Sequence, residues 1–277
     1  MLPAWPSLLG SLASTSCLLA LGCQARGSGT LPAATQVEVA AGPSSVASSG
    51  RGAPVALLEL FTSEGCSSCP AADENLAEIA REAERTGQRI FTLELHVDYW
   101  NYLGWVDPFS DAVSPSRQGA YAKQLGLRGV YTPQLLVNGR EELVGSDHAG
   151  SRAAIERALG TPARAALSIA AVRRDGAVEV DYRLEAPRAV ALNVAVAVDA
   201  AETHVSRGEN RDRQLFHRHV VRGFRSLAVA GHASGRVSVP WPAGRAPQAV
   251  FVAAFASDPT TLEVLGADAR LLAAANE

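Results

Sequence analysis

The chain has 277 residues, of which 47% are hydrophobic and 19% are charged, and its formal net charge is −3. This composition is typical of a folded globular protein that is long enough for one large domain or two ordinary ones. The small net charge, and the lack of a Lys/Arg cluster with interleaved aromatic residues in the sequence, argue against a nucleic-acid partner.

The N-terminal segment predicts export. Residues 1–22 contain no charged side chain, and their apolar part, SCLLALG, is too short to span a bilayer. We therefore expect residues 1–22 to be a signal peptide. The end of this segment, Ala20-Leu21-Gly22-Cys23, resembles a bacterial lipobox, which implies cleavage before Cys23 and acylation of its thiol. The expected location is the bacterial cell envelope or periplasm, with a lipid anchor; a plain secretory signal and a misplaced start site are the alternatives.

Residues 23–53 are rich in Gly, Ser, Ala and Pro and show no sustained period, so we expect a flexible linker there. From residue 54 to residue 160, apolar strand-like runs alternate with segments of helical period. The order β-α-β-α-β-β-α predicts a mixed sheet, because the first crossover implies parallel strands and Asn138-Gly139 implies an antiparallel hairpin. The expected strands are 54–61, 89–97 and two within 133–145, and the expected helices are 69–87, 114–127 and 147–160.

The pattern changes after Thr161-Pro162. Residues 161–277 alternate apolar and polar side chains between turn signals such as Asp175-Gly176. This alternation is typical of antiparallel strands, and we expect a separate all-β domain with a sandwich-like arrangement.

Four cysteines are present, but Cys17 lies in the signal and Cys23 would carry the lipid. The exported domain then keeps Cys66 and Cys69, which are separated by two serines in the segment CSSC. Three interpretations remain open for this pair: a redox centre, half of a metal site, or a structural disulfide. A single bond that closes so small a loop restricts the unfolded chain little, which disfavours the structural interpretation.

Two segments carry a resemblance to the thioredoxin-fold superfamily. CSSC lies between the first strand and the first helix, and GLRGVYTPQLLVNGRE (126–141) is similar to the thioredoxin segment in which a cis-proline precedes a strand. The resemblance implies an α/β thioredoxin-like domain over 54–160 and a cis bond between Thr132 and Pro133. A closer resemblance is to an uncharacterised exported bacterial thioredoxin-like family, a domain of unknown function. Its signature is similar to LELFTSEGCSSCP, HVDYWNYLGWVDPF, RQGAYA, VYTPQLLVNG and SRGENRDRQLFHRHVVR.

Chemistry at the cysteines follows from their place at a helix start. The positive end of the helix dipole lowers the pKa of a thiol there, and a second thiol two residues on resolves a mixed disulfide. We expect Cys66 to be the nucleophile and Cys69 the resolving thiol, with protein or peptide thiols and disulfides as partners and no cofactor. The resemblance implies that Thr132 and Pro133 position the partner chain. It also implies a buried carboxylate behind the pair, for which Glu59 is preferred over Glu94.

A metal site is the competing hypothesis. Cys66, Cys69 and His96 would form a Cys₂His set, because His96 ends the second strand at the expected ligand-binding edge. His217 and His219 are two residues apart, so in a strand they would share one face and either bind metal or face solvent.

One loop is unusually aromatic. Five aromatic side chains lie within residues 99–109, and they form either an apolar surface beside the cysteines or a small core that packs the loop onto the sheet. These five are Tyr99, Trp100, Tyr102, Trp105 and Phe109.

The sequence as a whole therefore predicts an exported thiol–disulfide oxidoreductase, with a non-enzymatic binding or metal-carrying module of the envelope as the alternative.

Overall fold

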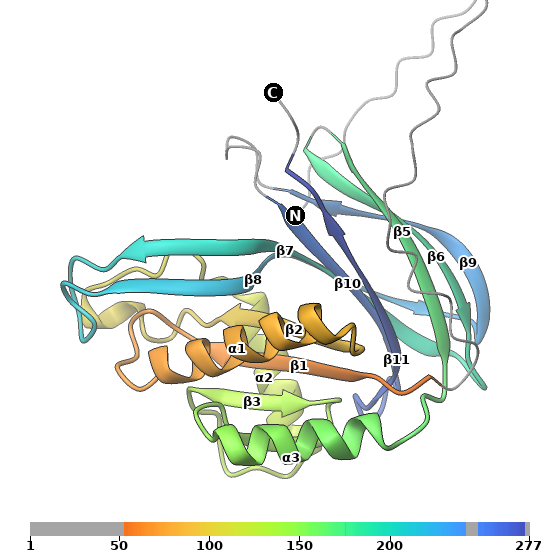
Figure 1. Cartoon of the computed structure of the whole chain (residues 1–277), viewed down its shortest axis with the longest axis horizontal. Coiled ribbons are helices and arrows are strands. Elements are labelled where there is room, and N and C mark those ends of the chain that lie inside the picture. The colour runs from red at the N-terminus through yellow and green to blue at the C-terminus, as the bar shows by residue number, and fades with distance from the viewer. Residues whose placement is uncertain (1–52, 175, 242–248, 275–277) are drawn as a thin grey trace, which may run out of the picture. The chain divides into compact units, whose positions relative to one another are not determined.

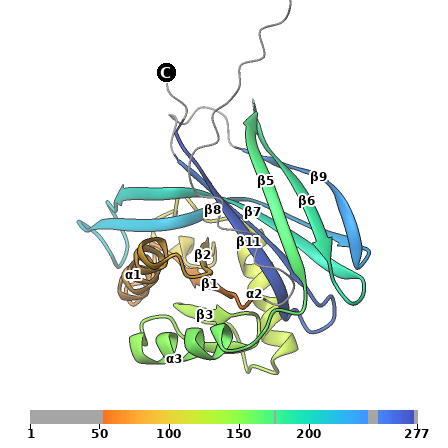
Figure 2. The same ribbon diagram turned by 45° about the vertical axis from the view of Figure 1, so that its right-hand side comes forward.

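The computed structural model describes residues 53–174, 176–241 and 249–274, and Figure 1 and Figure 2 show the arrangement of their helices and strands. The first part of the chain contains β1 (Ala56–Thr62), α1 (Pro70–Thr86), β2 (Ile90–His96), a 3₁₀ helix η1 (Asn101–Leu103), α2 (Val113–Gln124), β3 (Gln134–Val137), β4 (Glu141–Val144) and α3 (His148–Leu159). The rest contains β5 (Ala166–Arg174), β6 (Ala177–Glu185), β7 (Val190–His204), β8 (Gln214–Val229), β9 (His232–Pro240), β10 (Val250–Ser257) and β11 (Val264–Leu272).

An eight-stranded mixed sheet has the order β11-β10-β7-β8-β2-β1-β3-β4. Strand β1 is parallel to β2 and antiparallel to β3. The connection between β3 and β4 has positive φ at Asn138 (52°) and Gly139 (62°), as expected for the hairpin predicted there.

Strand β1 is buried along its whole length because the sheet is covered on both sides. Leu58 and Leu60 belong to a core with the apolar side chains of α1 and α3. Leu57 and Phe61 face the opposite side, where they pack with Tyr121 of α2. Side chains of β1 therefore point alternately towards α1 and towards α2.

A second layer covers the far half of the large sheet. Strands β5, β6 and β9 form a separate three-stranded antiparallel sheet, which Figure 1 shows beside β10 and β11. The apolar side chains between the two sheets form one core, which includes Val178 and Val180 of β6 and Val194 and Val196 of β7.

The hairpin of β7 and β8 connects the two halves of the molecule. Its strands are 15 and 16 residues long, so the same strands contribute to the core under β5 and β6 and also reach the first half of the chain. There β8 pairs in parallel with β2 at Glu94 and Val220. The loop 205–213 at the tip of this hairpin lies beside the turn that follows β1, as the contacts described below show.

The predicted fold class is wrong in its main feature. An α/β thioredoxin-like domain followed by a separate all-β domain was expected, but strands from both halves form one eight-stranded sheet, and the described residues are mostly β. The order β-α-β-α-β-β-α does occur between β1 and α3. The error has a physical cause: alternation of side chains identifies a strand but not its neighbour, so the pairing of β8 with β2 left no local signal. Thr161 and Pro162 lie in the connection between α3 and β5.

Candidate functional site

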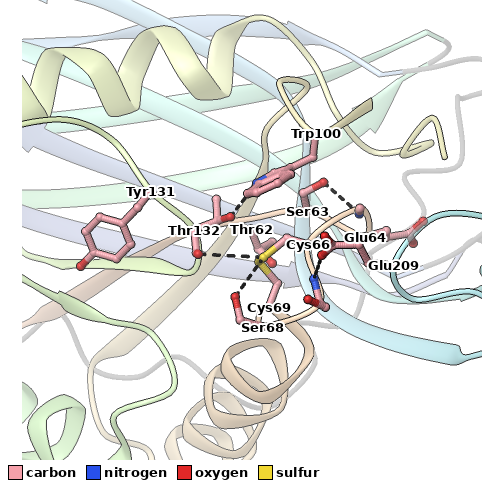
Figure 3. The surroundings of a disulfide bond; sticks show 12 residues. Thr62, Ser63, Glu64, Cys66, Ser68, Cys69, Trp100, Tyr131, Thr132 and Glu209 are labelled. Carbon is pink, nitrogen blue, oxygen red and sulfur yellow. Dashed lines mark hydrogen bonds between the residues drawn. A yellow bond between two sulfur atoms is a disulfide. The ribbon is translucent and has the colours of Figure 1, made fainter. Parts of the chain in front are cut away.

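The two cysteines flank the turn between β1 and α1. Cys66 and Cys69 form a disulfide, with their Cα atoms 5.5 Å apart, and Figure 3 shows its surroundings. Cys69 is the residue before Pro70, the first residue of α1, and the backbone N–H groups of Ala72 and Asp73 donate to its carbonyl oxygen. Both cysteines are buried, whereas Ser67 and Ser68 between them are exposed. The pair is thus reached from the side of the two serines.

The cis bond that the resemblance implied between Thr132 and Pro133 is present, and Thr132 lies close to Cys66. The Thr132 carbonyl oxygen lies 3.9 Å from Cys66 Sγ. The Thr132 hydroxyl accepts a 2.7 Å hydrogen bond from the indole of Trp100, which fixes this loop to the aromatic segment (Figure 3). Ser68 Oγ is 3.3 Å from Cys66 Sγ.

The tip of the β7–β8 hairpin makes hydrogen bonds to the turn that contains the cysteines. The sequence did not predict this contact. The buried side-chain amide of Asn210 donates to the carbonyl oxygens of Glu64 and Cys66, at 2.9 Å each. The Glu209 carboxylate accepts a 2.9 Å hydrogen bond from the backbone N–H of Ser67. Only the segment resemblance around GENR drew attention to this loop; no spacing rule relates it to residues more than 140 positions away.

The structure places Glu59 away from the face that carries α1. Its carboxylate accepts hydrogen bonds from Arg117 Nε (2.5 Å), Arg117 Nη2 (3.0 Å) and the Tyr121 hydroxyl (2.5 Å) on α2. Burial alone would lower the pKa of Arg117, but the Glu59 charge raises it above its ordinary value. Burial and then the Glu59 charge raise the pKa of Tyr121. Glu59 therefore serves an ion pair under α2 rather than a site under α1.

A buried polar cluster occupies the α1 face instead. It combines side chains of α1, β2 and β8 with two residues of neighbouring loops, and its members are Glu64, Asp73, Glu94, His96, Asp107 and His217. Glu94 and His96 share one face of β2, since they are two residues apart in a strand. His217 enters from β8, the neighbour of β2 in the sheet. The ring centroids of the two histidines are 4.8 Å apart.

The charged groups of this cluster shift the pKa values of one another. Burial, followed by the Glu94 charge, raises the pKa of Asp73 to about 7. Burial opposes the charged form of His96, but Asp107 outweighs it and raises the His96 pKa to about 9. Burial likewise opposes the charge on Asp107, whose pKa nevertheless falls to about 2 because of His96. Glu64 and Glu94 outweigh burial at His217 and raise its pKa.

The Cys₂His set proposed from the sequence is not assembled. Cys66 and Cys69 are bonded to each other, and His96 faces Glu94 and Asp107. His217 and His219 are both buried rather than solvated, and they belong to different groups. His219 has a positive φ of 53°, and its ring stacks on Phe251 and lies 2.7 Å from the Thr92 hydroxyl.

The aromatic loop combines the two expected roles. Phe109 is buried beside His96, and Trp105 donates to Glu64 Oε2 at 2.7 Å. Tyr102, by contrast, is 78% exposed. Trp105 and Phe109 therefore pack onto the site, whereas Tyr102 faces solvent.

The predicted signal peptide (1–22), the linker (23–53, apart from its last residue) and the lipidated Cys23 lie outside the described residues. Among the residues that are described, no helix is long and apolar enough to cross a membrane.

Comparison with known proteins assigns the chain to a family. The model of a family described as "Protein of unknown function (DUF1223)" matches residues 57–256. A similar crystal structure, a structural-genomics target from Agrobacterium tumefaciens, has 28% sequence identity and a TM-score of 0.57, and the match covers 79% of this chain and 95% of that one. A search of curated proteins finds no match. These matches do not name a thioredoxin-like superfamily. Since the family model spans most of the described residues, the chain belongs to the DUF1223 family.

Proposed function

We propose that the chain is a thiol–disulfide oxidoreductase whose redox pair is Cys66 and Cys69. The observation that carries the proposal is the position of this disulfide at the start of α1, with Ser67 and Ser68 exposed between the two sulfurs. A thiolate at such a helix start is stabilised by the partial positive charge of the helix N-terminus. The short loop also keeps the second sulfur within reach of the first.

The exchange reaction needs a protein dithiol as its partner. A substrate thiolate attacks Cys66 Sγ, the Cys66–Cys69 bond breaks, and Cys69 leaves as a thiolate that takes up a proton. The second substrate thiolate then attacks the substrate sulfur of the mixed disulfide, and Cys66 leaves as a thiolate that takes up the second proton. The substrate loses two electrons and two protons, and the enzyme pair gains them; the reverse sequence reduces a substrate disulfide.

The surroundings of Cys66 support a protein or peptide as the substrate. The Thr132 carbonyl oxygen lies beside the sulfur, and the preceding residues Val130 and Tyr131 are 43% and 37% exposed. Exposed apolar side chains next to a reactive group favour contact with an apolar stretch of another chain. Glu209 binds Ser67, so this contact must yield when a substrate approaches from the side of the serines.

We extend the proposal to the cell envelope. An oxidising compartment keeps such a pair oxidised, and the predicted signal over residues 1–22 and acylation of Cys23 would take the chain there. Mass spectrometry of the protein from membrane fractions tests this directly. A chain found without residues 1–22 and with a lipid on Cys23 supports the anchor, and an unprocessed chain refutes it.

Trapping of mixed disulfides tests the reaction. The Cys69→Ser variant, incubated with oxidised partner proteins, should accumulate mixed disulfides through Cys66, because no resolving thiol remains. The Cys66→Ser variant should accumulate fewer, since Cys69 (0% exposed) is less accessible than Cys66 (2% exposed). A Cys66→Ser/Cys69→Ser double variant controls for Cys17 and Cys23. Equal trapping by all three variants would exclude the proposed mechanism.

A further inference from the structure

Three buried ligand atoms converge beneath α1. Glu94 Oε2 lies 3.6 Å from His96 Nε2 and 3.1 Å from His217 Nδ1. The side chains are 0% exposed, and none of the three atoms has a hydrogen-bond partner among the described residues. Buried polar atoms in proteins nearly always make hydrogen bonds, so three atoms that face only one another and make none require an explanation.

Each of the three side chains is held in place through its other polar atom. His96 Nδ1 lies 2.8 Å from Asp107 Oδ2, and Asp107 also accepts from the backbone N–H groups of Glu64 and Phe109. Asp107 is thus an acceptor, so His96 Nδ1 is the donor. His217 Nε2 lies 3.3 Å from Glu64 Oε1 in the same manner. Carboxylates that orient imidazoles in this way are typical partners of metal-binding histidines.

The third side chain is oriented by the backbone. Glu94 Oε1 accepts a 3.1 Å hydrogen bond from the N–H of Arg218 on β8, which leaves Oε2 directed at the two imidazoles. The distances from Glu94 Oε2 to the two imidazole nitrogens, 3.1 and 3.6 Å, are close to the roughly 3.3 Å that separates two ligand atoms around a tetrahedral metal with bonds of about 2.0–2.1 Å. A fourth possible ligand atom is near, since Asp73 Oδ2 lies 3.8 Å from His217 Nδ1.

We propose that Glu94, His96 and His217 bind one divalent transition-metal ion, of which Zn²⁺ fits best, with Asp73 as a fourth ligand. Two imidazoles and two carboxylates suit Zn²⁺ in ligand type, and the ion would displace the imidazole protons as it binds. The site uses no cysteine sulfur, so it is independent of the redox pair and goes beyond the proposed exchange reaction. Mg²⁺ and Ca²⁺ should not compete, because they prefer oxygen ligands alone.

The place of the site in the fold gives the ion a structural role. Its ligands come from α1 and β2, which follow each other in the sequence, and from β8, which belongs to the second half of the chain. Asp73 lies in the first turn of α1, where its N–H donates to the Cys69 carbonyl oxygen at 3.1 Å. The bound ion would thus fix the start of the helix that carries the redox pair. Asp73 also lines a surface groove of about 450 Å³ between α1 and β8, which offers a route for the ion.

The wild-type protein, purified without chelators and equilibrated with Zn²⁺, provides the first test. Mass spectrometry should find about one zinc ion per chain, and zinc-edge X-ray absorption should show nitrogen and oxygen neighbours at about 2.0–2.1 Å without sulfur at about 2.3 Å. The Cys66→Ser/Cys69→Ser variant should keep the ion. Sulfur neighbours, or the lack of a stoichiometric ion, would overturn the proposal, and neither result depends on whether the cysteines exchange disulfides.

Variants locate the ion. Glu94→Gln and His217→Gln should lose it, and Asp107→Asn should bind it about 10–100-fold more weakly because His96 loses its orienting carboxylate. Glu84→Gln is the matched control: Glu84 is an exposed member of a second group with Asp199 and His219, and its loss should leave the zinc content unchanged. Circular dichroism confirms that each variant is folded. Full zinc content in folded Glu94→Gln and His217→Gln, or its loss in Glu84→Gln, would refute the assignment.

Discussion

Replacement of Arg117 by Met tests the position that the structure gives to Glu59. Arg117 makes two hydrogen bonds to the Glu59 carboxylate and one, of 2.8 Å, to the Tyr121 hydroxyl. Its guanidinium also lies 5.0–5.2 Å from the ring centroids of Tyr121, Phe224 and Phe255. In Arg117→Met the Glu59 carboxylate, which is 1% exposed, loses its cationic partner.

The expected loss of stability is large. Removal of one partner from a buried ion pair costs about 3–5 kcal/mol. At about 2–4 °C per kcal/mol for a chain of this size, the melting temperature should fall by roughly 6–20 °C. Calorimetry measures this shift, and urea titration followed by tryptophan fluorescence gives the free energy of unfolding. The Arg117→Met/Glu59→Gln double variant should recover part of the loss, because it leaves no buried unpaired charge.

The redox behaviour separates the two roles considered for Glu59. Since Glu59 faces α2 and the cysteines precede α1, the midpoint of the Cys66–Cys69 couple should be the same in Arg117→Met as in the wild type. A shifted midpoint with little change in stability would refute this reasoning, because it would show that Glu59 acts on the redox pair.

Three further predictions concern the cysteine turn and its support. Asn210→Ala leaves two buried carbonyl oxygens without their donor, and it should lower the free energy of unfolding, measured by urea titration, by about 1–3 kcal/mol. Asn210→Asp should have the same effect, because a carboxylate cannot donate a hydrogen bond. Wild-type stability in both variants would contradict this prediction. Glu209→Ala should speed alkylation of the reduced Cys66 at neutral pH, with stability within about 0.5 kcal/mol of wild type. Hydrogen bonds from Ser67 lower the Glu209 pKa, so the contact persists above that pKa and is lost as pH falls through it; an alkylation rate equal to the wild type at neutral pH would disprove this role. Gly145→Ala places a Cβ 2.6 Å from Leu60 Cδ1 and 2.9 Å from Ala72 Cβ, and it should destabilise the fold by about 1–3 kcal/mol. The control Gly119→Ala, in an open helical position, should be neutral or stabilising. Equal urea midpoints for the two variants would contradict the prediction, because they would show that the close contacts at Gly145 relax without loss of stability.

Local features were predictable from the sequence. The buried run of β1, the proline and glycine at the ends of α1 and the Asn138-Gly139 hairpin each depend on residues that are near in the chain. The cis bond before Pro133 came from the family resemblance alone. These features place Cys66 and Cys69 at the start of a helix, which is the part of the site that sequence reasoning reached.

The remainder depends on contacts between distant segments. A hydrophobic pattern counts His217 as a polar residue and so gives no sign that it is buried. Its burial beside His96 depends on the pairing of β8 with β2. The direction of Glu59 was equally hidden, since a strand that is apolar on both faces carries no sign of which face meets which helix. Glu94 and His96, two apart on one strand, were the available signal for the buried cluster, but their partner on β8 was not identifiable from spacing.

A redox titration of the full-length protein across glutathione buffers tests the central claim most directly. After alkylation and digestion, mass spectrometry quantifies the peptide that contains Cys66 and Cys69 separately from Cys17 and Cys23. The account predicts one reversible two-electron transition in which both thiols appear together, with a tenfold change in the ratio for about 30 mV. A pair that stays in one state over the whole range would contradict a role in disulfide exchange.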